Sequence, residues 1–217
     1  MIEAVVFDFD GVLSDSEPLH LAAYQEVLGE MDLTLTREDY YASLLGYSDD
    51  DVFRLVGAQQ GWNWNSGQIA ALITHKSAIF DRMVASGAVL YPSAPACIER
   101  LAARYPLGIA SGALRHEIQT VLTAAHLVHH FRFVVGAGDT PNSKPAPDPY
   151  LRAAELHGMK PSACVAIEDS RWGIESARAA GMKCVGITNT YPAAELTSAD
   201  RVIASLDEFT EELIESL

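Results

Sequence analysis

Short apolar segments alternate with longer amphipathic ones over the second half of the chain, and this alternation constrains the fold more than any other feature. The apolar segments that we predict as strands cover residues 107–110, 131–135, 164–167, 184–187 and 201–203. The segments that we predict as helices cover residues 94–105, 115–125, 147–158 and 173–180, with a last helix from residue 207. Strand and helix repeated in this way predict an α/β fold with a doubly wound, Rossmann-like parallel sheet and right-handed crossovers.

An all-helical segment interrupts this pattern after the first strand, which begins near Val5. The stretch has helical spacing over residues 37–45, 49–60 and 68–85, after a first helix that ends at about residue 29. Gly46 and Gly61 separate these helices, and Asp15 or Ser16 is expected to cap the first one. We therefore predict a Rossmann-like core of residues 1–15 and 88–217, with an inserted all-helical domain at residues 16–87 that could act as a lid.

Composition limits the classes of partner. At 217 residues the chain can bury one sizeable core and a small inserted domain. Its formal net charge of −14 disfavours nucleic-acid backbones and anionic membranes as partners. No apolar run reaches the length of a membrane span, and the N-terminus does not resemble a signal peptide. Three scattered cysteines indicate reduced, buried thiols, so we expect a cytoplasmic protein. We also expect a monomer.

The first strand ends in two aspartates, Asp8 and Asp10, followed by Gly11. Burying a carboxylate is costly unless a cation or hydrogen-bond donors compensate its charge. The two side chains therefore fit best at the carboxyl end of a central strand, where open α/β sheets bind ligands. Two carboxylates there suggest Mg²⁺, with Asp8 as a possible nucleophile and Asp10 as general acid and base. The alternative is that both aspartates cap the next helix or face water.

Polar residues also follow the later strands. Ser111 and Gly112 follow the second strand, and Glu168 and Asp169 follow residues 164–167. Carboxyl ends of parallel strands adjoin, so these groups should converge, with Ser111 bonding a phosphate oxygen and the acidic pair binding metal. Lys144 lies in a proline-rich loop that can aim its ammonium inward. The alternatives are a helix start for Ser111 and for the acidic pair, and a solvated side chain for Lys144.

Taken in order, these motifs resemble those of the haloacid dehalogenase superfamily of phosphotransferases. The matching segments are Asp8-Phe9-Asp10-Gly11-Val12, Ser111-Gly112, Lys144-Pro145 and Glu168-Asp169-Ser170. The helical insertion resembles the cap of subfamily I, which includes β-phosphoglucomutase and many sugar-phosphate phosphatases. The resemblance extends over nearly the whole chain, and its strength comes from the order and spacing of the motifs.

The resemblance implies a role for each matching residue. Asp8 would be the nucleophile and Asp10 the acid and base. Ser111, Gly112 and Lys144 would hold the transferring phosphoryl group. The Mg²⁺ ligands would be Asp8, Asp10, Glu168 and Asp169.

Residues of the cap are expected to select the substrate. His20 follows the first turn, and Lys76 falls where β-phosphoglucomutase has a lysine that contacts substrate; both could equally lie on a solvated helix face. The mutase also has an arginine at the position of Asp49, which grips a second phosphate. An aspartate there would repel that phosphate.

The sequence thus predicts a Mg²⁺-dependent phosphatase of small phosphorylated metabolites, such as sugar or polyol phosphates or phosphoglycolate. A phosphosugar mutase is the first alternative, and a non-catalytic binding protein on the same fold is a second. Few contacts define a cap pocket, so the sequence does not identify the substrate.

Overall fold

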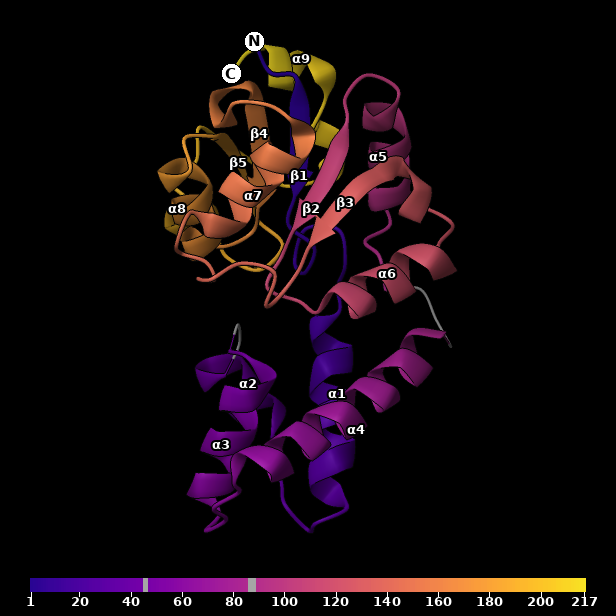
Figure 1. The fold of residues 1–217 in the computed structure, drawn as a ribbon, viewed down its shortest axis with the longest axis vertical. Coiled ribbons are helices and arrows are strands. Elements are labelled where there is room, and N and C mark those ends of the chain that lie inside the picture. Colours follow the sequence, from indigo (N-terminus) through magenta and orange to yellow (C-terminus); the bar gives the residue numbers. More distant parts are fainter. Residues whose placement is uncertain (45–46, 86–88) are drawn as a thin grey trace. The chain divides into compact units, whose positions relative to one another are not determined.

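The computed structural model describes residues 1–44, 47–85 and 89–217 (Figure 1). The chain forms two compact units. The first, here called the sheet unit, combines Met1–Asp15 with Val89–Leu217, and the second, the helical unit, is Ser16–Ala88. Each unit is described by itself below.

The sheet unit contains six parallel strands in the order β3-β2-β1-β4-β5-β6 within the described residues. They are β1 (Ala4–Phe7), β2 (Leu107–Ala110), β3 (Phe131–Val135), β4 (Cys164–Glu168), β5 (Lys183–Ile187) and β6 (Arg201–Ile203). Every strand is parallel to its neighbour, and β1 lies between β2 and β4. The doubly wound parallel sheet predicted from the sequence is therefore confirmed.

The helices of the sheet unit match the predicted pattern with small shifts at their ends. They are α5 (Ala94–Ala102), α6 (Arg115–Ala124), α7 (Asp148–His157), α8 (Arg171–Ala179) and α9 (Glu211–Glu215). The prediction that the last helix starts at residue 207 is wrong, because Leu206–Glu208 forms a separate 3-10 turn. The α9 helix starts after Thr210, whose side chain accepts a hydrogen bond from the Leu213 backbone N–H.

Side chains of β1 alternate between two apolar layers, as expected for a strand buried on both faces. Ala4 and Val6 belong to a buried cluster that includes residues of α7 and α8, among them Tyr150 and Ile174. Phe7 points the other way, and its ring packs edge-on against those of Phe131 and Phe209. The three cysteines, Cys97, Cys164 and Cys184, are free and buried, which agrees with the prediction of buried thiols.

The strand register brings the predicted motifs to one edge of the sheet. Phe7 pairs with Ile109 on one side and with Ile167 on the other. The residues that follow these three strands therefore emerge at the same carboxyl edge. The strands β1, β2 and β4 lie side by side in Figure 1 and run in the same direction.

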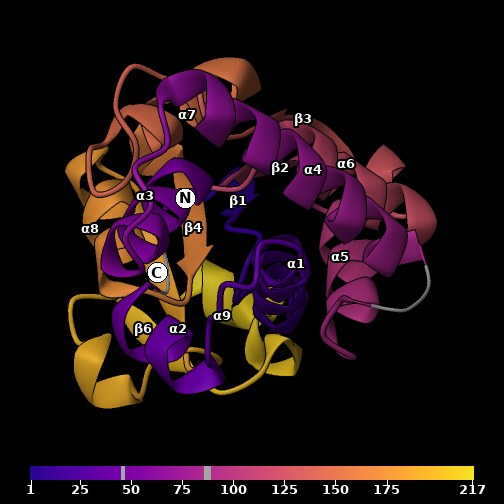
Figure 2. The same cartoon turned by 90° about the horizontal axis from the view of Figure 1, so that it is seen from below.

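The helical unit contains α1 (Glu17–Gly29), α2 (Arg37–Ser43), α3 (Asp49–Gln59) and α4 (Ser66–Ala85), seen from below in Figure 2. Leu45 and Gly46, which we placed at the end of the second helix and after it, lie outside the described residues. Ser16 occupies the N-cap position of α1, as expected, but its side chain makes no capping hydrogen bond. Within the described ranges, none of the helices combines the length and the apolarity that crossing a membrane requires.

Candidate active site

Asp8, Lys144 and Glu168 form a nearly buried chain of charges at the carboxyl edge of the sheet. Asp8 directly follows β1, and Glu168 is the last residue of β4. The Lys144 ammonium lies 3.0 Å from Asp8 Oδ1 and donates a hydrogen bond to Glu168 Oε1 at 2.5 Å. The Lys144 side chain is 13% exposed, so the loop directs it inward, as predicted, and not into solvent.

Asp169 completes an acidic cluster with Asp8 and Glu168. One carboxylate oxygen from each residue lies within 4.8 Å of the other two, and all three residues are buried. Gly11 makes room for this arrangement. A Cβ at Gly11 would lie 1.9 Å from Asp169 Oδ2, and the backbone φ of +75° also favours glycine. The turn after the first strand thus needs glycine to leave room for the Asp169 carboxylate.

The proton affinities of these groups reflect burial and mutual repulsion. Burial opposes the charge on Lys144, but the carboxylates of Asp8 and Glu168 outweigh it and raise the pKa of the ammonium. Burial and the Asp8 charge raise the pKa of Glu168 to about 7, although Lys144 acts to lower it. Burial, Asp8 and Glu168 together raise the pKa of Asp169 well above its usual range. Burial and mutual repulsion therefore oppose ionisation of all three carboxyl groups together, and Lys144 offsets this only in part.

A divalent cation fits this cluster on two grounds. The donors are carboxylate oxygens, which Mg²⁺ prefers over nitrogen or sulfur. Burial and repulsion between the carboxylates also raise the pKa values of Glu168 and Asp169, and a bound cation would favour their ionised forms. Asp8, Glu168 and Asp169 are thus the residues that would hold such an ion. The predicted fourth ligand, Asp10, is not a member of this group of described residues.

Asp10 lies in the turn just beyond Asp8 and is partly exposed. Its backbone forms an isolated bridge with Ser14. The Asn189 side chain, which comes from the segment after β5, donates a hydrogen bond to the Gly11 carbonyl at 2.8 Å. This turn is thus tied to a second strand end, and Asp10 is placed next to the acidic cluster in sequence but not within it.

Ser111 and Gly112 follow β2 at the same edge. Ser111 is buried, and its backbone N–H donates to the Val135 carbonyl at 2.9 Å. Its hydroxyl accepts a hydrogen bond from the Ala113 backbone N–H at 3.2 Å. The alternative reading of Ser111 as a helix cap is wrong, because the N-cap of α6 is Leu114.

Sequence reasoning missed four polar residues, of which three contact the acidic cluster and one contacts the Gly11 turn beside it. Tyr150 donates to Glu168 Oε1 at 2.6 Å, and the Ser170 hydroxyl donates to Glu168 Oε2 at 3.3 Å. Thr190 forms a hydrogen bond with Asp169 that acts to lower the pKa of that carboxyl. Asn189 is the fourth. Ser170 was within the quoted motif, but nothing in the sequence distinguishes Tyr150 from an ordinary core aromatic.

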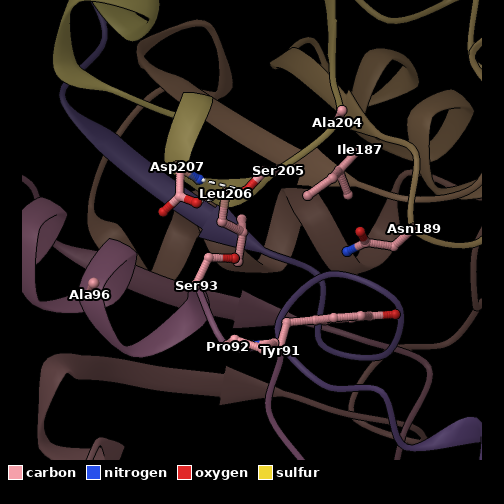
Figure 3. Close-up of a pocket in the computed structure, with 10 residues that line it drawn as sticks. All are labelled: Tyr91, Pro92, Ser93, Ala96, Ile187, Asn189, Ala204, Ser205, Leu206 and Asp207. Carbon is pink, nitrogen blue, oxygen red and sulfur yellow. Dashed lines mark hydrogen bonds between the residues drawn. The ribbon is translucent and has the colours of Figure 1, made fainter.

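A cavity of about 430 Å³ lies elsewhere in the sheet unit, between segments 91–93 and 204–207. Figure 3 shows Asn189 on one side of it and Tyr91 on the other. None of the predicted site residues is among the described residues that line it. Its connection to the acidic cluster is indirect, through the hydrogen bond between Asn189 and the Gly11 carbonyl.

In the helical unit, His20 and Lys76 lie together with Asp49. The fully buried Lys76 side chain places its ammonium 2.7 Å from His20 Nδ1 and 3.1 Å from Asp49 Oδ1. Burial and the Lys76 charge lower the pKa of His20 well below its usual value, so the ring is neutral and can accept this hydrogen bond. The Tyr24 hydroxyl donates to Asp49 Oδ1 at 2.5 Å. The reading of Lys76 as a solvated lysine is therefore wrong, whereas its role toward substrate stays a prediction.

Comparisons with known proteins find relatives by sequence and by fold. The family model for haloacid dehalogenase-like hydrolases matches residues 5–187. Protein CbbY of Rhodobacter capsulatus is 33% identical over 88% of this chain and 87% of its own length. Hexitol phosphatase B of Escherichia coli (strain K12) is 32% identical over 96% of this chain and 95% of its own length. A crystal structure of CbbY from Rhodobacter sphaeroides in complex with phosphate has a TM-score of 0.86 at 26% identity, covering 96% of both chains.

Proposed function

The chain belongs to the haloacid dehalogenase-like hydrolases, and on that premise we propose a Mg²⁺-dependent phosphatase that works through an aspartyl phosphate. It is an enzyme, a phosphoric monoester hydrolase. The observation that carries the mechanism is the convergence of Asp8, Lys144 and the acidic pair at one strand edge. An acidic cluster with a single paired ammonium suits an anionic substrate once a cation is bound.

Asp8 is the proposed nucleophile. Its carboxylate oxygen attacks the phosphorus atom, the ester P–O bond breaks, and Asp10 donates a proton to the departing alkoxide oxygen. In the second half of the reaction Asp10 takes a proton from water as the water oxygen attacks the same phosphorus. The acyl phosphate bond then breaks, which releases inorganic phosphate and restores the Asp8 carboxylate.

Lys144 and Ser111 are proposed to hold the phosphoryl group during transfer. The ammonium already lies 3.0 Å from Asp8 Oδ1, so it is next to the carboxylate that would attack. Ser111 and the backbone N–H of Gly112 emerge from the adjacent strand and would donate to phosphoryl oxygens. A Mg²⁺ ion bound by Asp8, Glu168 and Asp169 would supply positive charge to offset the phosphoryl oxygens.

We propose sugar or polyol monophosphates as the substrate class. Hexitol phosphatase B is among the relatives that this chain matches over nearly its full length. A small number of contacts in the cap would select the substrate, so the individual substrate has to be found by assay. Phosphoglycolate therefore remains in the test panel.

A phosphate-release screen with Mg²⁺ tests this proposal. The panel contains sugar phosphates, hexitol phosphates, phosphoglycolate, glycerol phosphate and nucleotides, and Asp8→Asn serves as the inactive control. Release of phosphate by the wild type alone is the expected result. No release from any compound, or equal release by the Asp8→Asn variant, would refute the proposed mechanism.

A phosphosugar mutase remains the second candidate, and one contact weighs against it. A mutase must hold a bisphosphate, which calls for cationic groups beyond those at the reacting phosphate. In the helical unit the Lys76 ammonium is paired with Asp49, so that its charge is largely neutralised within the unit. Glucose 1-phosphate with a bisphosphate primer separates the two functions, since a phosphatase yields free phosphate and a mutase yields glucose 6-phosphate.

A further inference from the structure

Tyr150 contacts the candidate active site from the apolar core. It lies in the first turn of α7, and its ring is fully buried in the cluster that joins this helix to the sheet. Its hydroxyl donates a hydrogen bond of 2.6 Å to Glu168 Oε1. The face of its ring also lies 5.1 Å from the Lys144 ammonium. One side chain therefore touches both partners of the Lys144–Glu168 ion pair.

The oxygen that Tyr150 contacts is the one that holds Lys144. Glu168 Oε1 accepts from Lys144 Nζ at 2.5 Å, and the same Nζ lies 3.0 Å from Asp8 Oδ1. A rotation of the Glu168 carboxylate would move Oε1 and weaken its hydrogen bond with the Lys144 ammonium. The hydroxyl of Tyr150 opposes such a rotation, because a hydrogen bond to a buried charged acceptor is among the stronger ones.

Two hydroxyl groups contact the buried Glu168 carboxylate in addition to Lys144. Gly173 in α8 lies against the carboxylate, and a Cβ there would be 1.9 Å from Glu168 Oε2. The absence of a side chain at Gly173 leaves room for the Glu168 carboxylate. The Ser170 hydroxyl reaches Oε2 at the long distance of 3.3 Å, so Tyr150 makes the shorter of the two hydroxyl contacts.

We propose that Tyr150 is a positioning residue for phosphoryl transfer, because its hydroxyl fixes Glu168 Oε1 and thereby keeps Lys144 beside Asp8. This inference rests on the proposed function. Tyr150 has no proposed contact with substrate, so the loss of the Tyr150 hydroxyl should affect catalysis only through Glu168 and Lys144. A purely structural role, by contrast, would lower stability and leave turnover unchanged.

The variant Tyr150→Phe removes the hydroxyl and keeps the ring. Loss of a hydrogen bond to a charged acceptor predicts a fall in kcat of about tenfold, with KM changed by less than about twofold. Tyr105→Phe is the matched control, since Tyr105 is a largely buried tyrosine that precedes β2, at the opposite edge of the sheet from the acidic cluster. Its kcat should equal that of the wild type.

Two further measurements test the route through Glu168. In a Glu168→Gln background the loss of the Tyr150 hydroxyl should cost clearly less than about tenfold, because the charged acceptor is already gone. A crystal structure of Tyr150→Phe should place Lys144 Nζ beyond about 4 Å from Asp8 Oδ1. Thermal unfolding of each variant shows that the compared proteins are folded.

The outcomes separate this inference from the proposed function. A wild-type kcat in Tyr150→Phe, an equal loss in both backgrounds, or an unmoved Lys144 in the crystal structure would each overturn the positioning role and leave the phosphatase assignment intact. No phosphate release by the wild type would refute the proposed function and the inference together.

Discussion

His157 should make the stability of the sheet unit depend on pH between about pH 6.5 and pH 4. This histidine ends α7, is 7% exposed, and packs its ring against that of Phe133 with centroids 4.6 Å apart. Its Nε2 is close enough to β2 that a Cβ on Gly108 would lie 3.0 Å away. Burial and the charge of Arg132 lower the pKa of His157 from 6.5 to about 4.

The free-energy change follows from that shift. The folded state holds His157 neutral, whereas the unfolded chain binds a proton below its pKa of 6.5. The contribution of His157 to the free energy of unfolding is therefore fully present above about pH 6.5 and is lost as the pH falls toward about 4. The difference between the pKa of 6.5 in the unfolded chain and about 4 in the folded protein corresponds to about 3 kcal/mol of the free energy of unfolding.

Urea unfolding of the wild type and His157→Gln over this pH range measures the effect. The difference in unfolding free energy between the two proteins should decrease by about 3 kcal/mol from about pH 8 to about pH 4. Carboxylates titrate in both proteins and cancel from the difference. The exposed His129 provides the control, and His129→Gln should follow the wild-type curve. Parallel curves for wild type and His157→Gln would refute the argument.

Three predictions concern the site itself. Asp8→Asn should lower kcat at least about ten-thousand-fold with the fold retained, as phosphate release and circular dichroism would show; turnover near the wild-type rate removes Asp8 as nucleophile. Chelation with EDTA should stop turnover and Mg²⁺ should restore it, so metal-independent activity would contradict the assignment of Asp169 as a ligand. Gly173→Ala should lower kcat at least about tenfold, because the added carbon lies 1.9 Å from Glu168 Oε2. The control is Gly29→Ala, where no atom lies within 4 Å of the added carbon, and an unchanged kcat in Gly173→Ala would show that Glu168 has space to move.

The arrangement of the sheet could be predicted because its signals are local. The β2 and β3 strands have the predicted bounds, since each is a short apolar run between turns. Ends of helices depend on capping contacts that the residue type alone does not determine. Ser16 is a favourable N-cap residue by type, yet its side chain makes no capping hydrogen bond. The last helix begins after Thr210, later than the predicted start at residue 207.

The convergence of Asp8, Lys144, Glu168 and Asp169 was predictable for a topological reason. Asp8, Glu168 and Asp169 lie at the ends of parallel strands, whose carboxyl ends adjoin at one edge of the sheet. Lys144 was assigned to the same site from the order of the motifs. Their roles in catalysis stay predictions. The predicted family and the class of phosphoric monoester hydrolase are confirmed by the comparisons.

Tyr150 lay beyond sequence reasoning because one residue serves two environments. Its ring packs in the apolar cluster, and its place in the helix pattern predicts only a core residue of α7. Only the packing of α7 against the sheet brings its hydroxyl to Glu168. The position of Lys144 beside Asp8 then depends on how the ring packs. A core substitution that shifts Tyr150 should therefore reduce turnover before it unfolds the protein. The reason is that the hydrogen bond from Tyr150 to Glu168 is 2.6 Å long, and a displacement much smaller than this length already weakens it.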